Sequence, residues 1–310
     1  MPPPTAPTTW TTRELLGWMT RAFEDKGLDS PRRMSEMLLA HVLGTERLKL
    51  YMDPDRPASP LERDQLRGLV GRALKHEPIQ YLVGEESFFG MTFTVDRRVL
   101  IPRPSTQTIV EEVLQHARSD PEARTMRASD AGAGLMIADV CTGSGCLALA
   151  LAKHLPGARV VASDLSVEAL SCAKENLERH GLTDRVELVE GDLLGPIEAH
   201  PVAGRAGALK YLVSNPPYIP DHEWDAVEPN VKDHEPTTAL RGGVDGLDLV
   251  RPILERGPKL LAKGGMLCVE LASSHAAEVL EIAKGDDRLE RARIVKDCDE
   301  LDRVLVAMRT

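Results

Sequence analysis

The sequence predicts an α/β protein in which helices cover both faces of a mostly parallel β-sheet, with a smaller helical domain in front. Three observations predict this architecture. The first eighty residues carry helical patterns, short β-prone runs follow near residue 90, and strand-like and helix-like segments alternate from about residue 135 onward. Such alternation is typical of parallel strands joined by crossover helices. A chain of 310 residues has room for two domains of unequal size.

Three helix start signals lie in the N-terminal region. Thr11 and Glu14 have the spacing of a capping box. Ser30-Pro31 and Ser59-Pro60 each place a capping residue before a proline in the first helical turn. The helices that begin there carry no nucleophile, metal cluster or phosphate loop, so we expect this region to dock a partner or to cover a site.

Between residues 88 and 101 the pattern changes to short β-prone runs, which Gly90 and Asp96 interrupt. We interpret these runs as a β-hairpin between the two domains. A helix is expected from about residue 106 to residue 116. The segment 118–134 is polar and rich in Ala, Gly and Asp, which indicates a loop.

After this loop, strands and helices alternate in the order that a parallel sheet requires. The predicted strands are 135–140, 159–163, 186–189, 209–214 and 266–271, and the predicted helices are 147–154, 167–179, 247–261 and 275–284. Two β-prone runs, 292–295 and 304–308, then follow each other directly. This succession predicts an antiparallel strand at the edge of the sheet.

Composition and charge exclude several classes of protein. Hydrophobic residues make up 42% and charged residues 28% of the chain, and no apolar run approaches the roughly 20 residues of a membrane span. The formal net charge of −10 argues against a large nucleic-acid footprint, because such binding needs clustered Lys and Arg. We therefore expect a chain that stably binds neither membranes nor nucleic acid.

The N-terminus and the cysteines indicate compartment and cross-linking. Residues 1–9 are rich in Pro and Thr and have neither the basic nor the apolar region of an export signal, so we expect a cytoplasmic protein. The five cysteines are odd in number and form no C-x-x-C pair, which argues against structural disulfides and zinc. We expect a monomer without a metal.

A glycine-containing loop follows the first strand of the alternating region and begins the first helix after it. Gly143 and Gly145 allow a tight turn close to a ligand, and the helix N-terminus offers free N–H groups behind them. Asp164 lies 19 residues past Gly145, at the end of the second strand, where a ribose-binding carboxylate belongs. The loop predicts a nucleotide-like cofactor, and by pattern alone it fits both NAD and S-adenosylmethionine.

A second carboxylate, Asp192, follows the third strand within Gly191-Asp192-Leu193. In that position it could accept a hydrogen bond from an adenine amino group. An aspartate at a strand end is as common in the cap of a helix or turn. The residues alone leave both readings open.

The tetrapeptide Asn215-Pro216-Pro217-Tyr218 after the fourth strand is the most informative motif in the chain. Its prolines restrict φ at consecutive positions and lack N–H donors, so they leave a rigid edge of acceptors. The Asn215 side-chain oxygen and the Pro216 carbonyl could each accept one N–H of a substrate amino group. Tyr218 could pack against a flat substrate group. A simple turn is the alternative, but the position of the motif behind a cofactor loop disfavours it.

This arrangement suits a methyl transfer to an amide nitrogen. An amide nitrogen is a poor nucleophile because its lone pair is delocalised into the carbonyl. Two acceptors can localise that pair and aim it at a methyl donor, so catalysis rests on positioning and needs no strong general base.

Together these motifs resemble those of class I S-adenosylmethionine-dependent methyltransferases that act on adenine, cytosine or glutamine amino groups. The resemblance is closest to the HemK family of release factor glutamine methyltransferases and covers about residues 35–283. It is also carried by the segments Glu77-Pro78-Ile79-Gln80-Tyr81-Leu82-Val83-Gly84, Phe88-Phe89-Gly90, Val99-Leu100-Ile101-Pro102-Arg103-Pro104, Glu235-Pro236 and Gly246-Leu247.

The resemblance implies a fold and a reaction. It implies a helical N-terminal substrate-docking domain at 1–86, a β-hairpin linker at 87–104, and a Rossmann-like, seven-stranded class I methyltransferase domain at 105–310. The implied reaction transfers a methyl group from S-adenosylmethionine to the glutamine side-chain amide in the Gly-Gly-Gln loop of class 1 peptide-chain release factors. The release factor would be the protein partner.

The resemblance also implies site residues. The tetrapeptide Asn215, Pro216, Pro217 and Tyr218 would hold the glutamine amide. The cofactor would be held by Cys141, Thr142, Gly143, Ser144, Gly145, Asp164, Asp192, Leu193 and Asn215.

The chain departs from the family pattern at two places. It reads Ser105-Thr106-Gln107 where the family usually has Glu-Thr-Glu, and it has Cys141 where glycine is usual. The first departure affects the identity of the expected substrate more than the expected methyl-transfer reaction. The second places a Cβ beside the cofactor loop.

Three other enzyme functions and one binding function compete with this interpretation. A glutamine methyltransferase for a ribosomal protein would share fold, cofactor and tetrapeptide. An adenine-N6 methyltransferase for DNA or RNA is disfavoured by the net charge. An NAD-dependent oxidoreductase fits the loop but leaves the tetrapeptide without a role. A binding protein without catalysis would bind the cofactor and transfer nothing.

Overall fold

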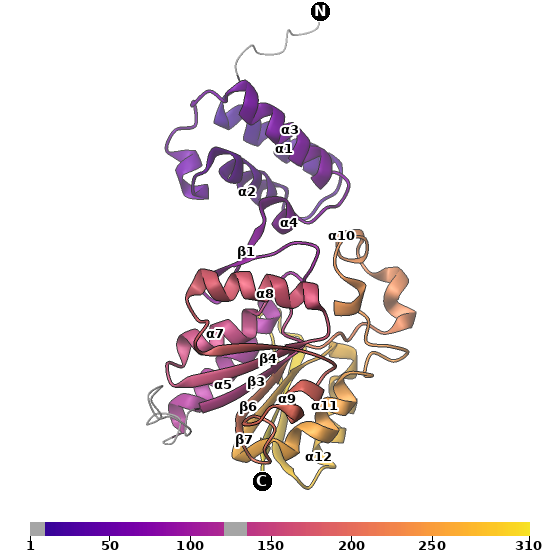
Figure 1. The fold of residues 1–310 in the computed structure, drawn as a ribbon. Helices are drawn as coiled ribbons and strands as arrows, with labels where there is room; N and C mark the ends of the chain where they lie inside the picture. The colour runs from indigo at the N-terminus through magenta and orange to yellow at the C-terminus, as the bar shows by residue number, and fades with distance from the viewer. Residues whose placement is uncertain (1–9, 121–134) are drawn as a thin grey trace, which may run out of the picture. The chain divides into compact units, whose positions relative to one another are not determined.

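The computed structural model describes residues 10–120 and 135–310, which form two compact units (Figure 1). The first unit holds the residues up to Gly84 together with Glu228–His234, and the second holds Glu85–Val227 and Glu235–Thr310. The β-hairpin thus groups with the second unit. The predicted domain limits at residues 86 and 104 remain a prediction.

The first unit is a small helical domain around its own core. Its helices are α1 (Thr12–Asp25), α2 (Pro31–Leu43), α3 (Pro60–Ala73) and α4 (Ile79–Val83), with a 3-10 turn, η1 (Arg47–Tyr51), between α2 and α3, and a short helix, α10 (Pro229–Lys232), from later in the chain. Met19, Phe23, Leu38 and Leu39 are fully buried in its centre. The helical patterns of the sequence are explained by this core.

Two of the three predicted helix starts have the predicted caps. Thr11 and Ser59 each form a full capping box with the glutamate three residues later. At the third start, α2 begins at Pro31 as predicted, but Ser30 has a left-handed backbone, with φ 50° and ψ 50°, and makes no capping bond. The Ser30 cap was therefore wrong, because a capping side chain needs an extended backbone to reach the first N–H groups.

A two-stranded hairpin begins the second unit. Strands β1 (Glu85–Phe88) and β2 (Met91–Thr94) pair antiparallel across a turn at Phe89 and Gly90. The Asn176 side chain holds the hairpin to helix α8 (Val167–His180), because it accepts the Thr94 N–H at 2.7 Å and donates to the Thr94 carbonyl at 3.0 Å. The β-prone run 99–101 forms no strand. Its Ile101 N–H is bonded to the Glu235 side chain instead, at 3.0 Å.

A seven-stranded sheet forms the centre of the second unit and confirms the predicted fold class. Its order is β5-β4-β3-β6-β7-β9-β8; the first five strands run parallel, and β9 is antiparallel to both of its neighbours. The strands are β3 (Leu135–Val140), β4 (Ala158–Asp164), β5 (Val186–Glu190), β6 (Leu209–Ser214), β7 (Leu261–Glu270), β8 (Leu289–Lys296) and β9 (Asp302–Arg309).

Helices cover both faces of this sheet (Figure 1). One face carries α5 (Gln107–Ser119), α7 (Cys146–His154) and α8, and the other carries α9 (Gly195–Ala199), α11 (Val250–Arg256) and α12 (Ala276–Lys284). The short 3-10 turns of this unit are η2 (Pro104–Thr106), η3 (Asp221–Ala226), η4 (Thr237–Ala239), η5 (Gly257–Lys259) and η6 (Ser273–His275). None of the helices within the described ranges has both the length and the apolarity of a membrane span.

Three details of this unit differ from the prediction. The antiparallel strand β9 lies between β7 and β8, so the edge strand is β8. The helix predicted for 247–261 is only α11, followed by the turn η5, because Pro258 has no N–H to continue the helical hydrogen bonds. Helix α5 continues to Ser119, and most of the loop predicted for 118–134 lies outside the described residues, as do residues 1–9.

Candidate active site

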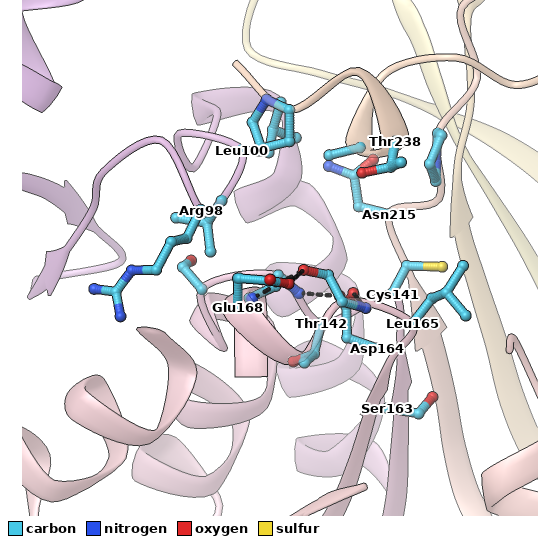
Figure 2. Close-up of a pocket in the computed structure, with 18 of the residues that line it drawn as sticks. Arg98, Leu100, Cys141, Thr142, Ser163, Asp164, Leu165, Glu168, Asn215 and Thr238 are labelled. Atoms are coloured by element: carbon cyan, nitrogen blue, oxygen red, sulfur yellow. Dashed lines mark hydrogen bonds between the residues drawn. The ribbon is translucent and has the colours of Figure 1, made fainter. Parts of the chain in front are cut away.

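A cavity of about 440 Å³ lies at the carboxyl ends of β3, β4, β5 and β6 (Figure 2). From β3 the chain continues through β4 to β5 on one side of the sheet and later returns to β6 on the other. Crossover connections therefore leave in opposite directions at β3 and β6, and ligands of open α/β sheets bind at such a switch point. The volume falls within the usual range for a small-molecule site.

The loop after β3 forms the floor of this cavity. Its backbone is left-handed at Cys141 (φ 61°), Gly143 (φ 55°) and Gly145 (φ 81°). A Cβ on Gly145 would lie 2.9 Å from the Leu149 side chain, whereas a Cβ on Gly143 would meet no atom within 4 Å. A Cβ on Gly145 would therefore displace the Leu149 side chain, while the space beside Gly143 is open to a ligand. Cys141 takes a backbone conformation that glycine adopts at lower cost.

Asp139, the penultimate residue of β3, holds this loop and the start of the following helix by hydrogen bonds. Its side chain is fully buried and accepts the Thr142 hydroxyl at 2.6 Å and the Ala148 N–H at 3.1 Å. Its second oxygen, Oδ1, is buried without a hydrogen-bond partner among the described residues. Burial raises the pKa of Asp139 to about 7. Neither the burial of Asp139 nor its hydrogen-bond partners can be recognised from the residues of the motif.

Asp164, at the end of β4, lines the cavity and is hydrogen-bonded to this loop. One carboxylate oxygen accepts the Gly143 N–H at 2.8 Å and the other accepts the Ser166 N–H at 3.0 Å. Burial raises the pKa of this carboxyl, and the backbone N–H groups oppose that effect. Each oxygen has a further lone pair for a ligand hydroxyl. Figure 2 shows Asp164 close to Thr142 and Cys141 in this view.

The carboxylate of Asp192 also lines the cavity, with Leu193 beside it. Asp192 is exposed, and helix α9, which follows it, has no side-chain cap. The capping alternative is therefore not observed at this helix. Its position at the end of the strand next to β4 leaves the carboxylate available to a ligand.

Two exposed apolar side chains border the same cavity and were not recognised in the sequence. Leu165 is 65% exposed and Val167 is 55% exposed, and both line the cavity. Apolar surface of this kind beside two carboxylates fits a ligand with a flat apolar ring and hydroxyl or amino donors. A nucleoside has this chemistry.

The tetrapeptide after β6 forms the opposite end of the cavity. Asn215 and Pro217 line it, and Figure 2 shows Asn215 beside Thr238. The Asn215 side chain donates from Nδ2 to the Thr106 hydroxyl at 3.0 Å. The preceding residue, Ser214, donates to the Val140 carbonyl at 2.7 Å, which ties the tetrapeptide to the cofactor loop.

Two glycines pack closely against the backbone of the tetrapeptide. A Cβ on Gly242 would lie 2.8 Å from the Tyr218 Cα, and a Cβ on Gly246 would lie 2.6 Å from the Tyr218 carbonyl oxygen. The Gly242 N–H donates to the Ile219 carbonyl at 2.9 Å. Only glycine allows this close approach, which explains the Gly-rich segment near residue 246.

Glu270, at the end of β7, is a fully buried carboxylate behind the tetrapeptide. It accepts the Thr106 hydroxyl at 2.7 Å, and the hydroxyls of Ser105 and Tyr218 each at 3.3 Å. Burial raises the pKa of Glu270, and the Thr106 hydroxyl and the Arg303 charge oppose this effect. Glu270 could not be recognised from the sequence, because its partners Thr106 and Ser105 lie about 165 residues away in the chain.

The segment after the hairpin forms a further wall of the cavity. Arg98, Leu100 and Pro102 line it from this segment, and Pro236 and Thr238 line it from a later loop. Glu235 is buried and joins the two segments through the Ile101 N–H and the Arg103 guanidinium, the latter at 2.5 Å.

Arg98 is the basic side chain among the described lining residues, but its charge is already paired. Its guanidinium binds Asp96 and Glu175, at 2.7 and 2.6 Å. Figure 2 shows the guanidinium directed away from the other labelled side chains. The cavity therefore presents carboxylates and apolar groups, and it suits a ligand with cationic or donor groups.

The structure brings most of the predicted site residues to this one cavity. Gly145, Pro216 and Tyr218 are not among the lining residues, although Pro216 lies between the lining residues Asn215 and Pro217 in the chain. The lining includes the predicted residues Cys141, Thr142, Gly143, Ser144, Asp164, Asp192, Leu193, Asn215 and Pro217. No group of acidic, histidine or cysteine side chains within the described ranges has the arrangement of a metal site.

Two family models match the chain. The PrmC N-terminal domain matches residues 14–84, and the Methyltransferase small domain matches residues 123–233. The first match falls in the helical unit. The second contains the cofactor loop and the tetrapeptide.

Curated relatives match almost the whole chain. A release factor glutamine methyltransferase from Chlorobaculum tepidum is 41% identical over 299 residues, which are 96% of this chain and 97% of that protein. One from Geobacter sulfurreducens is 42% identical over 274 residues, 88% of each chain. One from Rhodopirellula baltica is 35% identical over 298 residues, 96% of each chain.

Solved structures share the fold at low sequence identity. The catalytic domain of hMettl16 in complex with the MAT2A 3'UTR hairpin 6 has a TM-score of 0.53 and 15% identity, over 83% of this chain and 84% of that one. The N-terminal domain of human METTL16 in complex with SAH has a TM-score of 0.50 and 17% identity, over 83% of this chain and 85% of that one. At this identity the likeness concerns the fold alone.

Proposed function

Since the chain belongs to the release factor glutamine methyltransferase family, we propose that it methylates the side-chain amide nitrogen of the glutamine in the Gly-Gly-Gln loop of class 1 peptide-chain release factors. The methyl donor is S-adenosylmethionine. The observation that carries the proposal is the position of Asn215-Pro216-Pro217-Tyr218 at one end of a cavity whose other end carries Asp164 and Asp192.

The residues around the cavity fit this cofactor. Asp164 would accept from the ribose hydroxyls and Asp192 from the adenine amino group, while Leu165 and Val167 would cover the adenine faces. The open space beside Gly143 leaves room for the rest of the cofactor. When bound, the cofactor supplies an electrophilic methyl group on a positively charged sulfur.

The tetrapeptide would hold the nucleophile. The Asn215 Oδ1 and the Pro216 carbonyl would each accept one N–H of the glutamine amide, which localises the nitrogen lone pair and aims it at the methyl group. The nitrogen would bond to the methyl carbon as the sulfur–carbon bond breaks, the sulfur would leave as a neutral thioether, and the nitrogen would then lose a proton to solvent. Positioning supplies most of the catalysis, so no strong base is required.

We assign substrate docking to the N-terminal region, residues 1–86. The described part of this region offers apolar side chains to solvent on and beside η1, where Leu48 and Met52 are each 80% exposed. Such side chains suit contact with a folded protein substrate. Replacing both by serine is expected to raise the KM for the release factor several-fold and to leave the affinity for S-adenosylmethionine unchanged. A raised cofactor Kd would argue against docking.

The proposed reaction is tested with radiolabelled S-adenosylmethionine and a purified class 1 release factor. The control is the same factor with Gln→Ala in its Gly-Gly-Gln loop. Label on the intact factor alone is the expected result. Ribosomal proteins and nucleic acid are incubated in parallel, and label on either of these, with none on the release factor, would replace the proposed substrate.

A further inference from the structure

The side-chain amide of Asn215 has two different ends, and only one of them can hold a substrate amide. The Oδ1 end accepts N–H groups, whereas the Nδ2 end only donates. In the structure Nδ2 donates to the Thr106 hydroxyl at 3.0 Å. This leaves Oδ1 as the atom that is free to accept from a substrate.

The Thr106 hydroxyl can accept from Asn215 only if its own hydrogen is directed elsewhere. Glu270 Oε2 lies 2.7 Å from the Thr106 Oγ1, and both side chains are buried, at 0% and 1% exposure. In the structure the Thr106 hydroxyl donates to this carboxylate oxygen, which accepts. The three groups therefore form a chain of hydrogen bonds with a single direction, from Asn215 through Thr106 to Glu270.

The opposite direction would be unproductive. If Glu270 donated to Thr106, then Thr106 would donate to the Asn215 Oδ1, and the NH₂ of Asn215 would face the substrate. Two NH₂ groups cannot hydrogen-bond to each other, because neither offers a good acceptor. The Glu270 carboxylate also accepts the Tyr218 hydroxyl at 3.3 Å, so it contacts one end of the tetrapeptide directly and is linked to the other end, Asn215, through Thr106.

We propose that Glu270 and Thr106 are positioning residues that set which end of the Asn215 amide faces the substrate glutamine. This inference rests on the proposed function. Thr106 lines the cavity, and Glu270 does not. They act through Asn215, and their role is to fix its hydrogen-bonding direction before the substrate arrives.

The first test probes the chain of hydrogen bonds from Asn215 through Thr106 to Glu270 without any substrate. Side-chain amide proton exchange of Asn215 is followed by NMR, with its signal assigned by its loss in Asn215→Asp. We expect slow exchange in the wild-type chain, because the acceptor hydroxyl is buried, and at least about tenfold faster exchange in Thr106→Val. Equal exchange rates in the two proteins would show that Asn215 does not donate to Thr106, and this would overturn the proposal.

The second test measures turnover on the release factor. Thr106→Val removes the hydroxyl at nearly constant volume and is expected to lower kcat about 10- to 100-fold through misorientation, with the Kd for S-adenosylmethionine within about threefold. Thr106→Ser restores the hydroxyl and is expected to recover most of kcat. Glu270→Gln, whose carboxamide can donate as well as accept, should lower kcat about tenfold.

Thr108→Val is the matched control. Thr108 is buried in α5, two residues beyond Thr106, and does not line the cavity. The same chemical change there should leave kcat unchanged, and unfolding curves show whether each variant remains folded. An unchanged kcat in Thr106→Val, or a failure of Thr106→Ser to recover it, would overturn the positioning role. A wild-type chain that does not label the release factor would overturn the proposed function alone, since the exchange test needs no substrate.

Discussion

The two ends of the cavity are built in different ways. At the cofactor end, each carboxylate binds groups that are close to it in sequence: Asp139 binds Thr142 and Ala148, 3 and 9 residues away, and Asp164 binds Ser166 and Gly143, 2 and 21 residues away. At the substrate end, Asn215 binds Thr106 across 109 residues, and Thr106 binds Glu270 across 164. The first end is a local motif, and the second is assembled by the whole sheet.

This difference leads to separable functions. The loop at the proposed cofactor end is held by its own strand and helix and by the neighbouring strand β4, so substitutions there should change cofactor binding or local stability. The substrate end depends on side chains from three distant segments, so substitutions there should change turnover. Four predictions test this separation.

The largest expected effect concerns Asp139 and the stability of the cofactor end. Burial raises its pKa from 3.8 to about 7, so between these pH values the folded chain holds a proton that the unfolded chain has released. The contribution of Asp139 to stability is therefore greatest below about pH 4 and is lost as the pH rises to about 7. At about 1.4 kcal/mol per pKa unit, the change is about 4 kcal/mol.

Asp139→Asn removes this titration. Chemical denaturation of the wild-type chain and of the variant, each without cofactor, gives the free energy of unfolding at pH 4 to 8. The wild-type value minus the variant value should fall between pH 4 and about pH 7 and then level off. A constant difference would show that Asp139 does not titrate between these pH values.

The next effect belongs to the substrate end. Asn215→Ala should lower kcat on the release factor roughly 100-fold or more, the scale of losing one preorganised polar contact. Isothermal titration should give a Kd for S-adenosylmethionine within a few-fold of the wild-type value. Full turnover in this variant would remove Asn215 from the mechanism, and loss of cofactor binding would show that the two ends are not separable.

Asp164→Ala should have the reverse signature. It removes a carboxylate that would bind the ribose and that anchors Gly143, so the Kd for S-adenosylmethionine should rise roughly 10- to 100-fold. At saturating cofactor, kcat should remain within a few-fold of the wild-type value. Asp192→Ala is the comparison variant, and its effect should be smaller because the Asp192 side chain is exposed. An unaltered Kd in Asp164→Ala would place the cofactor elsewhere.

The smallest effect tests the backbone of the loop. Cys141 has φ 61°, a conformation that costs a residue with a Cβ about 1 kcal/mol or more. Cys141→Gly and Cys141→Ala both remove the thiol, but only the first removes the Cβ. The glycine variant should be about 1 kcal/mol more stable than the alanine variant in urea denaturation. Equal stabilities would show that the loop is not strained at this position.

The same comparison explains what the sequence could predict. The fold class and the position of the glycine loop and Asp164 at one cavity were predictable because their signals are local: strand–helix alternation, glycine spacing and an acid at a strand end. The tetrapeptide was recognisable because its own chemistry is distinctive. Its supports were not, since Thr106 and Glu270 acquire their role only when β7 and the start of α5 come together.

Errors in the fold prediction have the same origin. The Ser30 cap failed on a backbone conformation that no residue pattern reveals, and the position of β9 between β7 and β8 depends on pairing across the sheet. The walls formed by Leu100 and Pro236 also come from segments that are distant in sequence. Long-range assembly, more than local preference, limited the prediction.

The cysteine in the cofactor loop affects how the protein withstands oxidants. Cys141 lines the cavity, where burial raises the pKa of its thiol and keeps it protonated at neutral pH. Peroxides and alkylating agents attack the thiolate, so they react slowly at this position. Cys298 is exposed and does not line the cavity, and it is the thiol that oxidants reach first. Mild oxidation would therefore modify Cys298 at the surface of the protein and leave Cys141 in the loop unmodified.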